Sequence, residues 1–122
     1  MYSTLLLDHF QNPRNVGELA APAITVEVSN PACGDLMRLS VLIADGKLQD
    51  VRFKTRGCVA SIACGSLLTE LVEGMSLEQA AQVTADQVAA GLGGLPPASG
   101  HAGVLAADAL QAALKKVSSQ PQ

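Results

Sequence analysis

Aromatic side chains are almost absent from this 122-residue chain, which has no tryptophan, one tyrosine and two phenylalanines. Aliphatic residues must therefore fill most of any core. Charged residues are also scarce, at 16%, whereas 48% of the residues are hydrophobic, and this balance favours a packed globule over a disordered segment. The chain is long enough to bury a core, and we expect a single domain spanning residues 1–122.

An excess of positive charge is missing as well. The formal net charge is −3 and the sequence pI is about 5.2, so the chain offers no basic footprint for a phosphate backbone, and nucleic acid is not an expected partner. At the N-terminus, three leucines are followed at once by Asp8 and His9, a pattern that fits neither a signal peptide nor a membrane span. We therefore expect a cytoplasmic protein that does not contact a membrane.

Cysteine is rare, with only Cys33, Cys58 and Cys64 present. An odd number in an intracellular protein argues against a disulfide framework and favours metal binding, redox chemistry or burial. On a regular helix, Cys64 would lie about 9 Å beyond Cys58 and roughly 240° around the axis, too far for both sulfurs to bind one ion. Because Cys64 also shares a stripe with Leu68 and Leu71, we expect it to be buried. An unwound first turn, or a role as a sulfur relay or resolving thiol, is the alternative.

Apolar residues alternate with polar ones over 24–28, 37–43 and 51–54, which predicts three strands. Asp45-Gly46 predicts that a hairpin joins the last two. Helices are predicted near the N-terminus, after Cys58, at the capping-box patterns SLEQ and TADQ, and after His101. This order indicates an α+β fold, a three-stranded antiparallel sheet with helices packed on one face. In the last helix we expect five residues to be buried: Val104, Ala107, Leu110, Leu114 and Val117.

Four residues with ligating side chains stand at the ends of these predicted elements. Cys33 and Asp35 lie in the loop between the first two strands, Cys58 follows the third strand, and His101 precedes the last helix. Antiparallel order brings the end of the first strand, the start of the second and the end of the third to one edge of the sheet, and a docked last helix could bring His101 there too. Two thiolates, a carboxylate and an imidazole suit tetrahedral zinc or a site for iron.

Each candidate also has a plain structural interpretation. Cys33 could be a small loop residue, Asp35 could form an Asx-turn, and His101 could simply begin a helix. For Asp8 and His9, near the end of the first predicted helix, we expect helix-end and packing roles in preference to metal binding.

The same segments carry a family resemblance. YSTLLLDHFQNPRNVG, NPACGD, VRFKTRGC and LPPASGHAGVLAADAL occur in the order of their counterparts in the IscU/NifU N-terminal family of iron–sulfur cluster scaffolds, and the match covers nearly the whole chain. The resemblance implies a scaffold that receives iron and sulfide, holds a [2Fe-2S] cluster transiently and passes it to acceptor proteins. In the family, the matching positions hold the cluster ligands and an aspartate that promotes release of the cluster. The resemblance assigns these positions to Cys33, Asp35, Cys58 and His101.

Two positions depart from the family pattern. Family members that share the LPP and histidine segment have a cysteine directly after the histidine, which serves as a cluster ligand and accepts sulfur from the cysteine desulfurase. This chain has Ala102 there, which puts ordinary sulfur acceptance in doubt. The family's chaperone-recognition lysine is replaced by Ser99, which leaves docking to a dedicated chaperone open.

Three functional hypotheses follow. The first is a non-enzymatic scaffold or carrier, a monomer or weak homo-oligomer, whose Cys33, Cys58 and His101 bind iron or a transient [2Fe-2S] cluster while Asp35 keeps the cluster labile. Its partners would be a cysteine desulfurase and iron–sulfur acceptor proteins. The second is a relative that binds Zn²⁺ and docks or regulates the assembly machinery. The third is an enzyme with Cys58 as nucleophile and His101 as base, for which the sequence indicates no substrate pocket.

Overall fold

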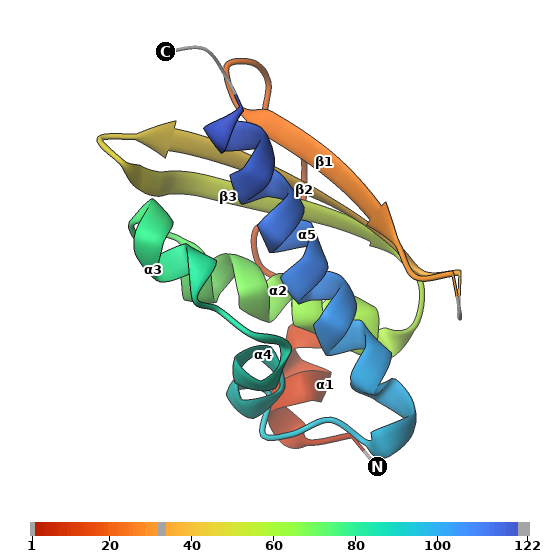
Figure 1. Ribbon diagram of the computed structural model, residues 1–122. Coiled ribbons are helices and arrows are strands. Elements are labelled where there is room, and N and C mark those ends of the chain that lie inside the picture. The colour runs from red at the N-terminus through yellow and green to blue at the C-terminus, as the bar shows by residue number, and fades with distance from the viewer. Residues whose placement is uncertain (1, 32–33, 120–122) are drawn as a thin grey trace.

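The structure is a computed structural model, and it describes residues 2–31 and 34–119. It confirms the α+β fold, with helices gathered on one side of a three-stranded antiparallel sheet (Figure 1). The helices and strands, in chain order, are α1 (Thr4–Gln11), β1 (Ile24–Ser29), β2 (Leu36–Ala44), β3 (Lys47–Arg56), α2 (Val59–Val72), α3 (Leu77–Ala81), α4 (Ala85–Gly91), a 3₁₀ turn (Pro97–Ser99) and α5 (Gly100–Ser118).

The sheet has the order β1-β2-β3, and its register aligns the strand ends that matter for the site. Ser29 at the end of β1 pairs with Leu36 at the start of β2, and Leu36 pairs with Arg56 at the end of β3. The hairpin between β2 and β3 turns at Asp45 and Gly46, whose φ angles of 55° and 73° are both positive. A two-residue turn of this kind needs positive φ at both positions, so the hairpin predicted from Asp-Gly is confirmed.

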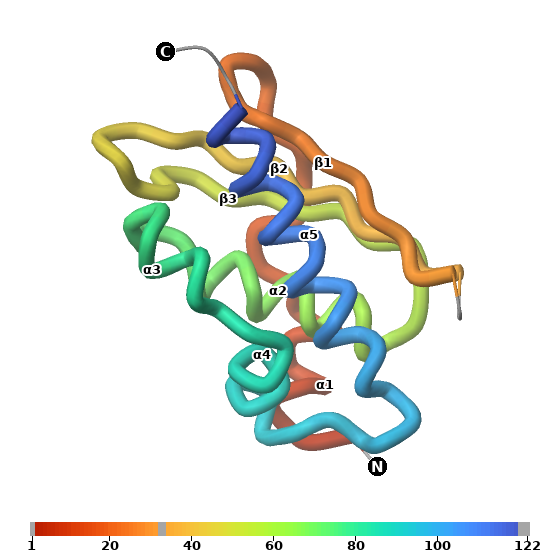
Figure 2. Tube along the Cα trace, in the orientation of Figure 1, coloured from red at the N-terminus to blue at the C-terminus, as the bar shows by residue number. Residues whose placement is uncertain are grey.

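Helices α2 and α5 lie side by side across the same face of the sheet (Figures 1 and 2). Met37, Leu39 and Val41 of β2 point toward them and are fully buried. Helix α2 is the central element, because β3, α1, α4 and α5 all pack around it. Nine of its 14 residues are buried, as expected for a helix enclosed on most sides.

Helix α2 approaches the sheet very closely at Gly65. A Cβ atom placed on Gly65 would lie 2.5 Å from Cδ2 of Phe53 on β3 and 3.1 Å from Cε of Met37 on β2. Phe53 and the missing side chain of Gly65 therefore complement each other, since the ring of Phe53 fills the space that a larger helix residue would take. This close packing holds the middle of α2 against β3.

The buried face of α5 differs from the one predicted. Leu110 and Leu114 are buried as expected and Ala107 and Val117 partly so, but Val104 is 47% exposed, so its predicted burial was wrong. The helix is turned so that small residues face the sheet and α2, which lets it lie close to both. Its buried residues are Ala102, Gly103, Leu105, Ala106, Ala109, Leu110, Ala113 and Leu114. Within the described ranges, neither α5 nor any other helix is long and apolar enough to cross a membrane.

The segment between α1 and β1 covers part of the free edge of β3. Phe53 N donates to Asn15 O and Gly17 N donates to Phe53 O, each at 2.9 Å, so residues 15–17 add a short parallel bridge to that edge. The chain then crosses the sheet face opposite the helices, where Arg38 of β2 donates to Glu18 at 3.1 Å. The backbone groups of Phe53 at this edge are therefore not free to pair with another chain.

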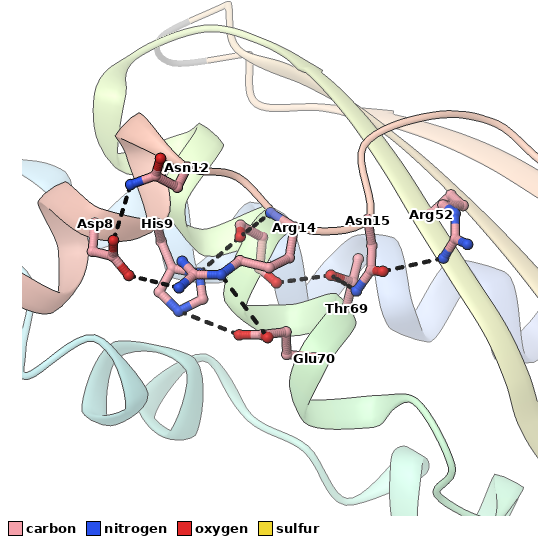
Figure 3. A network of polar contacts seen from close by, with 9 residues as sticks. Asp8, His9, Asn12, Arg14, Asn15, Arg52, Thr69 and Glu70 are labelled. Atoms are coloured by element: carbon pink, nitrogen blue, oxygen red, sulfur yellow. Dashed lines mark hydrogen bonds and ion pairs between the residues drawn. The ribbon is translucent and has the colours of Figure 1, made fainter.

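A polar network fastens α1 to α2 (Figure 3). His9 is 6% exposed, and its Nδ1 lies 2.7 Å from Oγ of Ser66 on α2. The backbone N–H of Arg14 also donates to Ser66 Oγ, at 2.9 Å, and the Arg14 guanidinium pairs with Asp8 at 2.6 Å. His9 Nε2 lies 3.5 Å from a carboxylate oxygen of Glu70. The packing role predicted for His9 is therefore confirmed.

Candidate metal centre

Three of the four predicted ligands meet at one edge of the sheet. Asp35 comes from the loop before β2, Cys58 immediately precedes α2, and His101 lies in the first turn of α5. One ligating atom from each residue lies within 4.8 Å of the other two. Cys33 lies outside the described residues, so its role and that of the whole ligand set remain predictions.

The distances between these atoms are close to those of a tetrahedral metal site. Cys58 Sγ lies 3.9 Å from His101 Nε2, which in turn lies 3.7 Å from Asp35 Oδ2. Usual zinc bond lengths in a tetrahedron would separate sulfur from nitrogen by about 3.6 Å and nitrogen from oxygen by about 3.3 Å. The two separations that involve His101 thus exceed the tetrahedral values by about 0.3–0.4 Å, and the third, between the Cys58 sulfur and an Asp35 oxygen, is no more than 4.8 Å. The donor set of sulfur, nitrogen and oxygen fits zinc or iron.

The carboxylate of Asp35 is held at the N-terminal end of α2. Its Oδ2 accepts the Ser61 hydroxyl at 2.5 Å and the backbone N–H of Cys58 at 3.4 Å. Gly57 makes room for it, since a Cβ atom there would lie 2.5 Å from Asp35 Cγ. Cys58, the N-cap residue, makes no side-chain capping bond of its own, so Asp35 supplies the negative charge that a helix N-terminus favours.

The electrostatics of Asp35 favour its ionised form. Burial alone would raise the pKa of this carboxyl, but hydrogen bonds from Ser61 and Cys58 and the nearby His101 lower it, and the net direction is below the ordinary value of 3.8. Hydrogen bonds that a buried carboxylate accepts favour its charged form and can outweigh the effect of burial. Asp35 is therefore available as a charged oxygen ligand at neutral pH.

The site is open to solvent on one side. The side chain of His101 is 29% exposed and Cys58 is partly exposed, whereas the side chain of Asp35 is only 9% exposed. The carboxylate thus forms the inner wall of the site, and the imidazole and the thiol form its rim. An ion or cluster held here could be reached by another protein without unfolding of the helices.

Two further positions of interest, Cys64 and Ala102, are closed to solvent. Cys64 is fully buried in the core, which confirms the burial predicted for it. Burial, with a smaller effect of Cys58, raises the pKa of the Cys64 thiol to about 12. Ala102, which follows His101 on α5, is also fully buried.

Comparison with known proteins places the whole chain in one family. The model of the NifU-like N-terminal domain matches residues 1–122. The chain belongs to the NifU-like N-terminal domain family. Among its relatives, "Iron-sulfur cluster assembly scaffold protein IscU 1" of Archaeoglobus fulgidus is 46% identical over 93% of this chain and 74% of that protein. The IscU scaffold protein of Haemophilus influenzae is 45% identical over 93% of this chain and 92% of that protein.

Two solved structures share the fold. The N-terminal part of a NifU-like protein from Brucella abortus superposes with a TM-score of 0.78, covering 98% of this chain and 95% of that one at 18% identity. A putative scaffold for the SUF system from Fervidobacterium islandicum gives 0.76, covering 93% and 96% at 22% identity. These likenesses concern the fold alone.

Two residues of this family member's site were not singled out from the sequence. Ser61 stands three residues after Cys58, and that spacing on a helix start could have indicated a hydroxyl near the thiol. Its contact with Asp35 spans 26 positions in the chain and leaves no local pattern. Gly57 carried no signal beyond being a glycine at a strand end, because its importance comes from the closeness of the Asp35 carboxylate.

Proposed function

We infer that this protein is an iron–sulfur cluster scaffold: it receives iron and sulfide, holds a [2Fe-2S] cluster transiently and passes it to acceptor proteins. The observation that carries the proposal is the convergence of Asp35, Cys58 and His101 at a solvent-open edge. Family relatives that bear the name of scaffold, at 45–46% identity over 93% of the chain, support the same role.

The chemistry of the three side chains suits a carrier better than a permanent cofactor site. Cys58 offers a thiolate, the strongest of the three donors toward iron, whereas His101 and Asp35 offer nitrogen and oxygen. Mixed ligation holds iron less tightly than four thiolates. Exposure of the imidazole and the thiol at the rim then leaves the cargo accessible to a donor, such as a cysteine desulfurase, and to an acceptor protein.

Anaerobic reconstitution with iron, sulfide and a cysteine desulfurase tests this function. We expect visible absorption typical of a [2Fe-2S] centre in the wild-type protein and its loss in Cys58→Ser and His101→Ala. Cys64→Ala is the matched control, because this thiol is buried away from the rim, and it should keep the chromophore. No chromophore in the wild-type protein would overturn the scaffold function.

A second candidate function rests on Ala102. Where family members have a sulfur-accepting cysteine, this chain has a buried methyl group, so it could bind Zn²⁺ and dock the assembly machinery without building clusters. The same reconstitution separates the two functions. Stable binding of one zinc ion per chain without a chromophore would favour the docking role over the scaffold role.

A further inference from the structure

The hydroxyl of Ser61 is buried inside the candidate site. Ser61 lies in the first turn of α2 and is fully buried. Its Oγ donates to Asp35 Oδ2 at 2.5 Å and lies 3.4 Å from Cys58 Sγ. Because the one hydroxyl proton goes to the carboxylate, Ser61 can only accept from the thiol. Ser61 thus contacts two of the three candidate ligands, Asp35 and Cys58, from the buried side of the site.

The contacts of Asp35 converge on a single oxygen. Ser61 Oγ and the backbone N–H of Cys58 both bond to Oδ2, and His101 Nε2 lies 3.7 Å from the same atom. The close approach of Gly57 leaves the carboxylate little room to turn. Of these contacts, the Ser61 bond is the shortest, and it holds Oδ2 toward the thiol and the imidazole.

We propose that Ser61 is a positioning residue that presets the Asp35 carboxylate for metal binding. This inference rests on the proposed function of the site. A carboxylate oxygen can accept one hydrogen bond and bind a metal ion with its remaining lone pair, so Ser61 need not leave when an ion arrives. Loss of a hydrogen-bond partner behind a metal ligand typically weakens metal affinity by about 10–100-fold.

Ser61 also supports the fold, since its bond links the loop before β2 to α2. The Ser61→Ala variant will therefore lose some stability whatever its role at the site. Ser66 provides a matched control on the same helix: it is equally buried, and its hydroxyl bonds to His9 and Arg14, outside the candidate site. Ser66→Ala loses a buried hydroxyl without touching Asp35, Cys58 or His101.

The experiment is anaerobic titration of the metal-free protein with Co²⁺, whose absorption reports thiolate and nitrogen ligation, followed by competition with Zn²⁺. We expect Ser61→Ala to bind both ions about tenfold or more weakly and Ser66→Ala to bind them as the wild-type protein does. In the Asp35→Ala background, Ser61→Ala should cause no further loss, because the carboxylate that Ser61 positions is gone. Circular dichroism and urea unfolding establish that each variant is folded.

The outcomes separate this inference from the function on which it rests. Wild-type protein that shows no thiolate-dependent Co²⁺ spectrum would overturn the metal site and the inference together. If the wild-type protein binds Co²⁺ and Ser61→Ala binds it equally well, only the role of Ser61 is overturned. The same conclusion follows if the loss persists in the Asp35→Ala background, or if Ser66→Ala weakens binding as much.

Discussion

Acidification should loosen the attachment of α1 to α2 through His9. Burial lowers the pKa of His9 from its ordinary value of 6.5, and the charge of Arg14 lowers it further, whereas Glu70 and Asp8 act in the opposite direction without reversing the shift. Because Arg14 N–H already donates to Ser66 Oγ, the Ser66 hydroxyl can donate to Nδ1 of a neutral ring. The Nε2 proton then faces Glu70 (Figure 3).

The sign of the effect follows from this lowered pKa. The unfolded chain binds a proton on His9 near pH 6.5, whereas the folded protein resists it, so the stability contributed by neutral His9 is complete above that pH. It is lost as the pH falls below 6.5, by up to about 1.4 kcal/mol per pH unit until the folded protein also takes up the proton. Between pH 7.5 and 5.5 the loss from this one group is therefore at most about 1.4 kcal/mol.

Urea unfolding at pH 7.5, 6.5 and 5.5 measures this loss, with His9→Gln as the control that cannot titrate. The pKa values of Asp8 and Asp35 are lowered, so both carboxylates stay ionised over this range and do not contribute to the difference. As the pH is lowered from 7.5 to 5.5, we expect the free energy of unfolding to decrease more in the wild-type protein than in His9→Gln. Equal slopes, or a wild-type protein that gains stability at pH 5.5, would show that burial does not dominate the titration of His9.

Three substitutions test the packing and the site. Gly65→Ala should lower the free energy of unfolding by up to about 2 kcal/mol. Overpacking against Phe53 costs about 1–3 kcal/mol, and the higher helix propensity of alanine offsets about 1 kcal/mol of that cost. Unchanged stability in urea would show that the ring can move aside. Gly57→Ala should displace the Asp35 carboxylate and weaken Co²⁺ binding about tenfold or more, and wild-type affinity would contradict the close approach. Ala102→Cys should raise cluster yield or sulfur uptake on reconstitution, and no change would mean that sulfur enters elsewhere.

The sheet and the helix starts were predictable because their signals are local. Alternating apolar and polar residues mark the strands, and Asp45-Gly46 marks the hairpin. Capping boxes begin α3 at Ser76 and α4 at Thr84, where both reciprocal bonds are present. The buried face of α5 was predicted wrongly at Val104 because the prediction followed large residues. In a helix that packs this closely, alanine and glycine mark the interface, and hydrophobicity alone does not separate them from exposed alanines.

The site was predictable only as far as topology reaches. Antiparallel order brings the loop of Asp35 and the end of β3 to one edge, and the structure places His101 beside them. The hydrogen bond from Ser61 to Asp35 and the space left by Gly57 depend on the position of a side chain to within about 1 Å. Such contacts arise from packing of distant segments, and no periodicity in the chain encodes them.

The supply of thiolates links the two candidate functions. Burial raises the pKa of the Cys64 thiol to about 12, so this thiol stays protonated at neutral pH, and its sulfur lies in the core. Ala102 supplies no sulfur, so one chain can offer its cargo at most the thiolates of Cys58 and Cys33. A [2Fe-2S] cluster bound by one chain would then depend on His101 and Asp35 for its other ligands. Since nitrogen and oxygen donors hold iron less tightly than thiolates, a cluster bound in this way would be held weakly and exchangeably, and under the proposed function the position of Asp35 would govern how long it stays.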